Sequence, residues 1–301
     1  MRVVTSAMSK GELVLVTGAT GRVGKEVVAR LASMPGFRVR AATRDKAEYA
    51  KSLGAHETVT FDLEDKSTWE PALRGATRLF SSTQDKYIER HMEFAKFCGE
   101  TPEIRDSLKH VVRVSCFGAD TNTNCYDKSV HVSRPNAEIP LMLQHYWWSE
   151  ECFIDAGFKD KLTSIRGNFY MNHLLKNELD RIKTKGSFTS PLGDTKNSFV
   201  ACNDMAEAAV RCLVEGPERH GDKYYDICGA QSLSMAEVAE ILTKALATDE
   251  AKNVCPEAHG KRITYEPQDI EQFEQDFGPT RAEFFEYLRN GFYSRCSPDF
   301  Y

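Results

Sequence analysis

The sequence predicts an α/β protein built on a doubly wound parallel sheet of the Rossmann type. Short apolar runs alternate with stretches of helical periodicity through the first half of the chain. The first run, residues 13–16, ends at a glycine-rich turn, and apolar residues then recur at helical spacing over residues 23–31. Strands that alternate with helices in this way form a parallel sheet, because each helix carries the chain back to the same edge.

Further apolar runs extend this alternation. They predict strands at residues 37–42, 59–61, 78–80, 110–114 and 162–166, with helices at 84–98 and 141–156. Beyond residue 166 helical segments dominate, at residues 204–214, 235–246, 269–277 and 281–288. We therefore expect a flexible leader at residues 1–10, a Rossmann domain at 11–166, and a smaller, mostly helical substrate lobe at 167–301 that interleaves with the sheet.

Composition argues against several classes of function. The 301 residues carry a net charge of −5 without a long Lys/Arg run, so nucleic acid is not an expected partner. No stretch approaches the roughly 18 apolar residues of a membrane span, and residues 1–10 lack the apolar core of a secretory signal. The nine cysteines form no C-x-x-C pair, which favours reduced thiols and a cytoplasmic location. The histidines show no metal-ligand spacing, so no metal is expected.

A G-x-x-G-x-x-G motif lies between the first predicted strand and the first predicted helix. It comprises Gly18, Gly21 and Gly24, with Thr20, Arg22 and Val23 between them. Glycines at these positions permit a tight turn and let backbone N–H groups approach a pyrophosphate at the helix N-terminus. The motif and its strand–turn–helix context predict a dinucleotide-binding site.

Two arginines favour NADP(H) over NAD(H). Arg44 follows the second predicted strand and Arg22 lies in the glycine turn, so both can pair with a 2′-phosphate. Asp45 lies near the position where NAD-specific sites carry an acid, but Glu48 three residues later favours Asp45 as the cap of the next helix. The alternative is that the two arginines are solvated surface residues.

Other candidate cofactor contacts follow three more strands, at the edge of the sheet where ligands bind. They are Asp62 and Leu63 after the third strand, Ser82 and Thr83 after the fourth, and Ser115, Cys116 and Phe117 after the fifth. The Asp62 carboxylate can accept a hydrogen bond from the adenine amino group, or it can instead cap a turn. Ser115 is the stronger candidate beside the nicotinamide.

The usual proton relay of short-chain dehydrogenases, a Tyr-x-x-x-Lys pair, is absent. Each tyrosine fails the test, including Tyr146, which has Glu150 where the lysine would be. Any reduction catalysed by this chain therefore takes its proton from another group or from water.

Several motifs together resemble the NmrA-like group of atypical short-chain dehydrogenases/reductases. They are the run from Thr17 to Gly24, Glu150 with Gly157 seven residues later, the block from Arg166 to Asn172, the helix opening at Asn203, and the segment from Tyr225 to Ser234. The resemblance spans about residues 13 to 290. It implies that Gly167, Asn168, Phe169 and Tyr170 face the nicotinamide and the substrate.

The resemblance implies two functions, because the group contains quinone and imine reductases as well as NADP-sensing regulators. The leading hypothesis is an NADPH-dependent reductase that transfers a hydride to a small flat electrophile such as a quinone, an imine or an activated alkene. Tyr146, His145 and Tyr170 are its candidate proton donors, with packing as the alternative role of each. The rival is a non-catalytic redox sensor that acts through protein partners, which the missing Tyr-x-x-x-Lys pair favours. Aromatic residues near the C-terminus suit either core packing or a homodimer contact.

Overall fold

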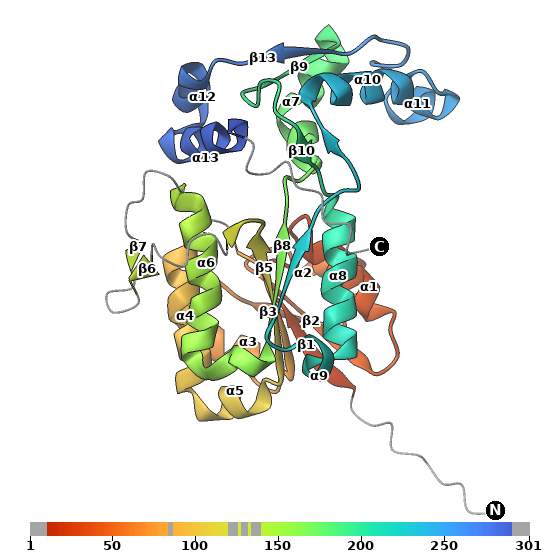
Figure 1. Cartoon of the computed structure of the whole chain (residues 1–301). Helices are drawn as coiled ribbons and strands as arrows, with labels where there is room; N and C mark the ends of the chain where they lie inside the picture. The colour runs from red at the N-terminus through yellow and green to blue at the C-terminus, as the bar shows by residue number, and fades with distance from the viewer. Residues whose placement is uncertain (1–10, 84–86, 120–125, 128–131, 134–139, 291–301) are drawn as a thin grey trace, which may run out of the picture. The chain divides into compact units, whose positions relative to one another are not determined.

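The computed structural model describes residues 11–83, 87–119, 126–127, 132–133 and 140–290 (Figure 1). The expected leader at residues 1–10 lies outside this part of the chain. The chain divides into two compact units. The first unit comprises residues up to 115, residues 148–166 and residues 203–225, and the second comprises residues 116–147, residues 167–202 and residues from 226 onward. Each unit is therefore assembled from three separate segments.

Seven strands form one central sheet in the order β11-β8-β5-β4-β1-β2-β3. Their bounds are β1 Glu12–Val16, β2 Phe37–Thr43, β3 Glu57–Thr60, β4 Arg78–Ser81, β5 His110–Cys116, β8 Leu162–Gly167 and β11 Lys223–Ile227. The pairs from β3 through β5 are all parallel. The strand order reverses at β1, which has β2 on one side and β4 on the other. Such a switch point is where open α/β sheets bind ligands. The predicted fold class is confirmed.

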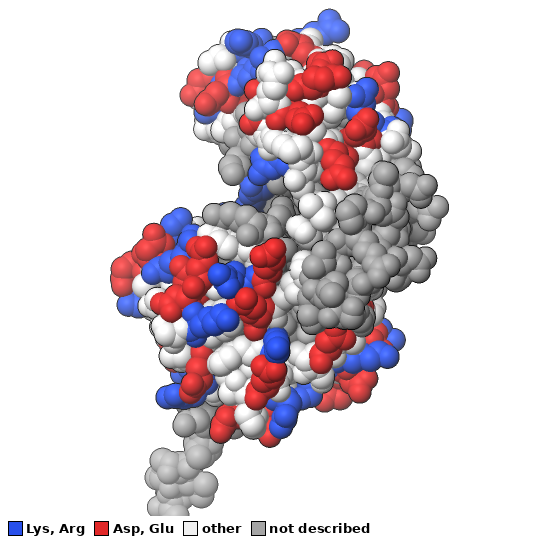
Figure 2. Space-filling view, turned by 90° about the vertical axis from the view of Figure 1, so that its left-hand side faces the viewer, with Lys and Arg blue, Asp and Glu red and all other residues white. Residues whose placement is uncertain are grey.

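Helices cover both faces of this sheet, as a doubly wound fold requires. Figure 1 shows α1 and α8 on one face and α4 on the other. The helices of this part of the chain are α1 Gly24–Ala32, α2 Ala47–Ser52, α3 Trp69–Leu73, α4 Ile88–Glu100, α5 Pro102–Ser107, α6 Leu141–Phe153, α8 Cys202–Glu215 and α9 Pro217–His220. Buried β-branched, leucine and aromatic side chains of the strands form the core between the layers. Within the described residues, no helix is both long enough and apolar enough to cross a membrane. Acidic and basic side chains are interspersed on the face shown in Figure 2.

The second unit contains mostly helices with short strand pairs. Its elements are β6 Tyr126–Asp127, β7 Val132–Ser133, α7 Asn172–Lys185, β9 Ser187–Ser190, β10 Asn197–Ser198, β12 Ser232–Leu233, α10 Met235–Leu246, α11 Asp249–Val254, β13 Thr264–Pro267, α12 Ile270–Phe277 and α13 Pro279–Arg289. One apolar cluster, which includes Ile182, Phe188, Leu192 and Leu288, forms its core. The sequence analysis did not assign α7.

A buried ion pair joins α6 to β8 within the first unit. The Arg166 guanidinium donates to both carboxylate oxygens of Glu150, at 3.0 and 2.8 Å. The Arg166 side chain is 7% exposed and that of Glu150 is 1% exposed. The ring of Tyr224 stacks on the guanidinium at 4.8 Å. Because neither charge can reach water easily, each depends on the other for its compensation.

A second buried polar group lies at the amino end of β5. His110 Nε2 is 2.8 Å from the hydroxyl of Thr163, and that hydroxyl donates to the His220 carbonyl at 2.6 Å. Burial lowers the pKa of His110 to about 3, because the imidazolium would lose its hydration. His110 is therefore neutral in the folded protein at ordinary pH.

We expect the substitution Arg166→Met to lower the free energy of unfolding by about 3–5 kcal/mol, because it leaves the Glu150 carboxylate buried without its counter-charge. The double variant Arg166→Met/Glu150→Leu should recover most of this loss. Urea denaturation of the three proteins measures both effects. A double variant no more stable than Arg166→Met alone would contradict this account of the pair.

Stability should fall as the pH is lowered from about 6.5 toward 3. An unfolded histidine titrates near pH 6.5, whereas folded His110 titrates near 3. In this pH window the unfolded chain therefore binds a proton at residue 110, whereas the folded chain does not. This difference lowers the free energy of unfolding by about 2 kcal/mol at pH 5. His110→Gln removes this contribution, so its urea midpoint should drop less between pH 7 and pH 5 than that of the parent or of the exposed-site control His56→Gln. Equal drops in the urea midpoints of His110→Gln and the parent would refute this role of His110.

Candidate functional site

The glycine-rich turn after β1 is shaped by two glycines that cannot be replaced without strain. Gly18 has φ +60°, in the left-handed region that side chains disfavour. A Cβ at Gly24 would lie 2.1 Å from the Gly18 carbonyl oxygen, so α1 can begin this close to the turn only because residue 24 has no side chain. Gly21 donates its N–H to the same Gly18 carbonyl at 2.8 Å, which closes the turn between them.

The N-terminus of α1 presents backbone N–H groups without intrahelical acceptors. Within the described residues, the N–H groups of Arg22, Val23 and Gly24 have no hydrogen-bond acceptor. Val23 occupies the N-cap position and makes no side-chain capping hydrogen bond. Unsatisfied N–H groups at the positive end of a helix favour an anion such as a phosphate. The predicted site residues 18–24 therefore come together in an arrangement that suits a pyrophosphate.

Thr17 connects this turn to the end of β4. Its buried hydroxyl donates to the Phe80 carbonyl at 3.1 Å and accepts from the Ser82 N–H at 3.0 Å. These contacts hold the residues after β1 and the residues after β4 together at the carboxyl edge of the sheet. Sequence reasoning did not list Thr17 as a site residue, although its position directly before Gly18 was a usable signal.

Arg44 lies exposed at the end of β2. Its guanidinium donates to the Tyr87 hydroxyl at 3.4 Å. This hydrogen bond, together with the nearby carboxylates of Asp62 and Asp45, raises the pKa of Arg44 above its ordinary value. The side chain therefore carries a positive charge at every physiological pH and is available to an anionic ligand.

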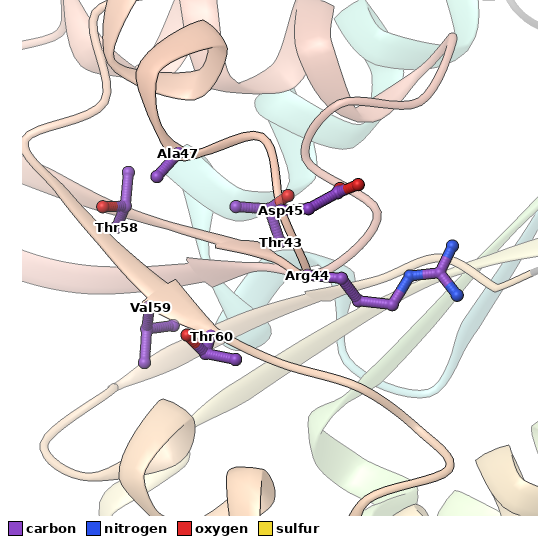
Figure 3. Close-up of a pocket in the computed structure, with 7 residues that line it drawn as sticks. All are labelled: Thr43, Arg44, Asp45, Ala47, Thr58, Val59 and Thr60. Atoms are coloured by element: carbon purple, nitrogen blue, oxygen red, sulfur yellow. The ribbon is translucent and has the colours of Figure 1, made fainter.

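A small pocket of about 180 Å³ adjoins Arg44. Its lining residues come from the end of β2, the start of α2 and the edge strand β3 (Figure 3). They are Thr43, Arg44, Asp45, Ala47, Thr58, Val59 and Thr60. Asp45 does not cap α2 as predicted, because α2 begins at Ala47 and its N-cap residue is Lys46. The hydroxyl of Thr43 accepts the Lys46 N–H at 3.1 Å instead.

Asp62 has a structural role in the turn after β3. Its Oδ1 accepts the Glu64 N–H at 3.0 Å, and its carbonyl accepts from the Trp69 indole at 2.9 Å. The turn-capping alternative is thus present in the structure, while the predicted contact with adenine stays a prediction. Leu63 beside it is half-buried.

The residues predicted after β4 and β5 lie at the carboxyl edge of the same sheet. Ser82 and Thr83 are half-buried. Ser115 is 3% exposed, and its hydroxyl has no hydrogen-bond partner among the described residues. A buried hydroxyl without a partner is costly, so a ligand or a water molecule that satisfies Ser115 would be favoured there.

The remaining predicted nicotinamide contacts belong to the second unit. Cys116 and Phe117 are each 9% exposed and form part of its apolar core. The Phe117 N–H donates to the Gly167 carbonyl at 3.0 Å, and the Asn168 N–H donates to the Ile227 carbonyl at 2.9 Å. The predicted roles of these residues toward a cofactor stay predictions.

The proposed proton donors in the second unit differ in their surroundings. Tyr146 and Phe169 pack against the apolar core, which is the packing role that the sequence left open for Tyr146. Tyr170 is half-buried, and its ring stacks on that of His173. The ring centroids are 5.9 Å apart and the angle between the ring planes is 6°. Sequence reasoning missed His173, which follows Tyr170 by three residues at the start of α7. His145 is half-buried.

The described residues contain no group of three or more His, Cys, Asp or Glu side chains arranged to hold a metal ion. The seven cysteines that the structure describes are all free thiols.

Comparison with known proteins places this architecture in a family. The model of the NmrA-like family matches residues 10–283. The NAD(P)H azoreductase of Xenophilus azovorans is 28% identical over 291 residues, which are 96% of this chain and 88% of that protein.

Solved structures with low sequence identity share the fold. The Citrobacter sp. triphenylmethane reductase in complex with NADP(H) has a TM-score of 0.71 at 19% identity and covers 96% of this chain and 93% of its own. NmrA, a negative transcriptional regulator solved in complex with NAD, has a TM-score of 0.63 at 17% identity. The match covers 94% of this chain and 82% of NmrA. Because the family model matches nearly the whole chain, this protein belongs to the NmrA-like family.

Proposed function

We propose that this chain is an NADPH-dependent reductase that transfers a hydride to a small flat electrophile, such as a quinone, an imine or an activated alkene. The observation that carries the proposal is the glycine turn with its open N–H groups at the switch point of the sheet. Membership of the NmrA-like family and the similarity to an NAD(P)H azoreductase support an oxidoreductase.

The preference for NADP(H) rests on Arg44. An arginine directly after β2 can bind a 2′-phosphate through charge-assisted hydrogen bonds. An NAD-specific site carries an acid near the end of the second strand. Here Arg44 is the first residue after β2, and Asp45 follows it. The triphenylmethane reductase of similar fold was solved with NADP(H), and NmrA was solved with NAD.

The chain's own residues bind the cofactor and manage the proton. When bound, the nicotinamide supplies the hydride. The N-terminus of α1 would hold the pyrophosphate, and Arg44 would hold the phosphate on the ribose. Since Tyr-x-x-x-Lys is absent, the proton comes from water or from one of the candidates Tyr170, Tyr146 and His145. We favour Tyr170 over Tyr146, because Tyr146 packs against an apolar core.

A redox sensor is the second candidate function. The similarity in fold to a negative transcriptional regulator favours it, as does the missing tyrosine–lysine pair. A sensor would bind the same cofactor at the same glycine turn and would act through a protein partner instead of an acceptor. Turnover separates the two functions.

The test is NADPH oxidation by the purified protein across a panel of quinones, imines and enones, with NADH in parallel. We expect turnover on at least one acceptor class. The matched control is Gly21→Asp, which should fold but lose activity, because it puts a carboxylate against the expected pyrophosphate position. Tight NADPH binding without turnover on any acceptor would replace the reductase by the sensor. Unchanged NADPH binding by Gly21→Asp would refute the site.

Arg44→Ala should weaken NADPH binding roughly 10- to 100-fold, as expected for hydrogen bonds to a charged group, and should leave NADH binding unchanged. Equilibrium titration of both cofactors against the parent and the variant measures the ratio. Arg74→Ala removes an exposed arginine of the same unit and serves as the control. An unchanged NADPH-to-NADH ratio in Arg44→Ala would contradict the proposed preference for NADP(H).

A further inference from the structure

One hydrogen bond spans the nucleotide end of the sheet. Arg44 directly follows β2, and Tyr87 directly precedes α4 on the connection from β4. In the sheet, β2 and β4 flank β1 on opposite sides. The bond from the Arg44 guanidinium to the Tyr87 hydroxyl therefore bridges the two connections on either side of the glycine turn.

Both side chains in this bridge are long. Strands separated by one intervening strand lie about 10 Å apart, so long side chains suit a contact between connections that leave two such strands. In Figure 3 the Arg44 side chain is extended and points away from Thr58, Val59 and Thr60 on β3. The direction of Arg44 is thus away from the edge strand.

The chemistry of the acceptor matters for an anion-binding arginine. The carboxylates of Asp62 and Asp45 lie close enough to raise the pKa of Arg44, but the hydrogen bond of its guanidinium goes to the Tyr87 hydroxyl. A carboxylate that paired with Arg44 would neutralise its charge, and a phosphate would have to displace it. The phenol of Tyr87 is neutral, so it can fix the direction of the guanidinium and leave its positive charge for a ligand.

We propose that Tyr87 determines cofactor specificity by positioning the Arg44 guanidinium for the 2′-phosphate of NADPH. This inference rests on the proposed use of NADP(H). Holding a long arginine side chain in one direction before the ligand arrives reduces the rotamer entropy that binding must remove. Tyr87 acts through Arg44 and therefore contributes only when the ligand carries the 2′-phosphate.

The experiment is a double-mutant cycle with Tyr87→Phe, Arg44→Ala and the combined variant, each titrated with NADPH and with NADH. Tyr87→Phe removes only the hydroxyl and keeps the ring. We expect it to weaken NADPH binding roughly 2- to 10-fold, the worth of one hydrogen bond, and to leave NADH binding unchanged. In the Arg44→Ala background Tyr87→Phe should have no further effect. Tyr49→Phe, at an exposed position of the same unit, is the control.

The outcomes separate the inference from the proposed function. If Arg44→Ala leaves the NADPH-to-NADH ratio unchanged, the preference for NADP(H) fails and the role of Tyr87 fails with it. If Arg44→Ala changes the ratio but Tyr87→Phe does not, only the role of Tyr87 is overturned. Equal weakening of NADPH and NADH by Tyr87→Phe, which a general structural effect would produce, also overturns it, as does a further loss in the combined variant.

Discussion

The close approach of α1 to the glycine turn is the constraint on which the nucleotide site depends. The position of a Cβ at residue 24 is already taken by the Gly18 carbonyl, so the helix can begin at this point only with glycine. This approach places the N-terminus of α1 beside the end of β1, where the strand order reverses. The hydroxyl of Thr17 adds a second connection, to the residues after β4.

Charges are handled differently in the core and at the site. In the core, Arg166 and Glu150 neutralise one another, and burial keeps His110 uncharged. At the carboxyl edge, Arg44 stays exposed and charged beside a neutral phenol. The first arrangement avoids the cost of isolated buried charge, and the second leaves an exposed positive charge, which we propose binds the 2′-phosphate of the cofactor. The same residue type is therefore a buried ion-pair partner at one position and the proposed phosphate-binding group at another.

Much of the fold could be predicted because its signals are local. Apolar runs and helical periodicity located six of the seven strands of the sheet but not β11, and the predicted helix at 235–246 coincides with α10. The helix α7 was missed, although Leu179 and Ile182 continue a helical pattern that begins near its start. Helix α8 lies in the first unit and not with the helices predicted after residue 214. It covers one face of the sheet, and β11, which follows it in the chain, forms an edge strand of that sheet. That placement depends on contacts between distant parts of the chain, which periodicity does not report.

The site could be predicted in part for the same reason. The glycine motif is a local pattern, and its geometry follows from the absence of side chains. The partner of Arg44 is 43 residues away in sequence, and that of Glu150 lies 16 residues away on another element. Asp45 matched a capping pattern, yet α2 begins one residue later than that pattern requires. Such outcomes depend on which side chains meet in the folded chain.

The most direct test of the central claim is a calorimetric titration of the purified full-length chain with NADPH. The account predicts one saturable site per chain, with competition by adenosine 2′,5′-bisphosphate. This molecule carries the 2′-phosphate and one 5′-phosphate of NADPH but no nicotinamide. Competition would locate the affinity in the glycine turn and Arg44. A folded protein that bound neither NADPH nor NADH would contradict the account.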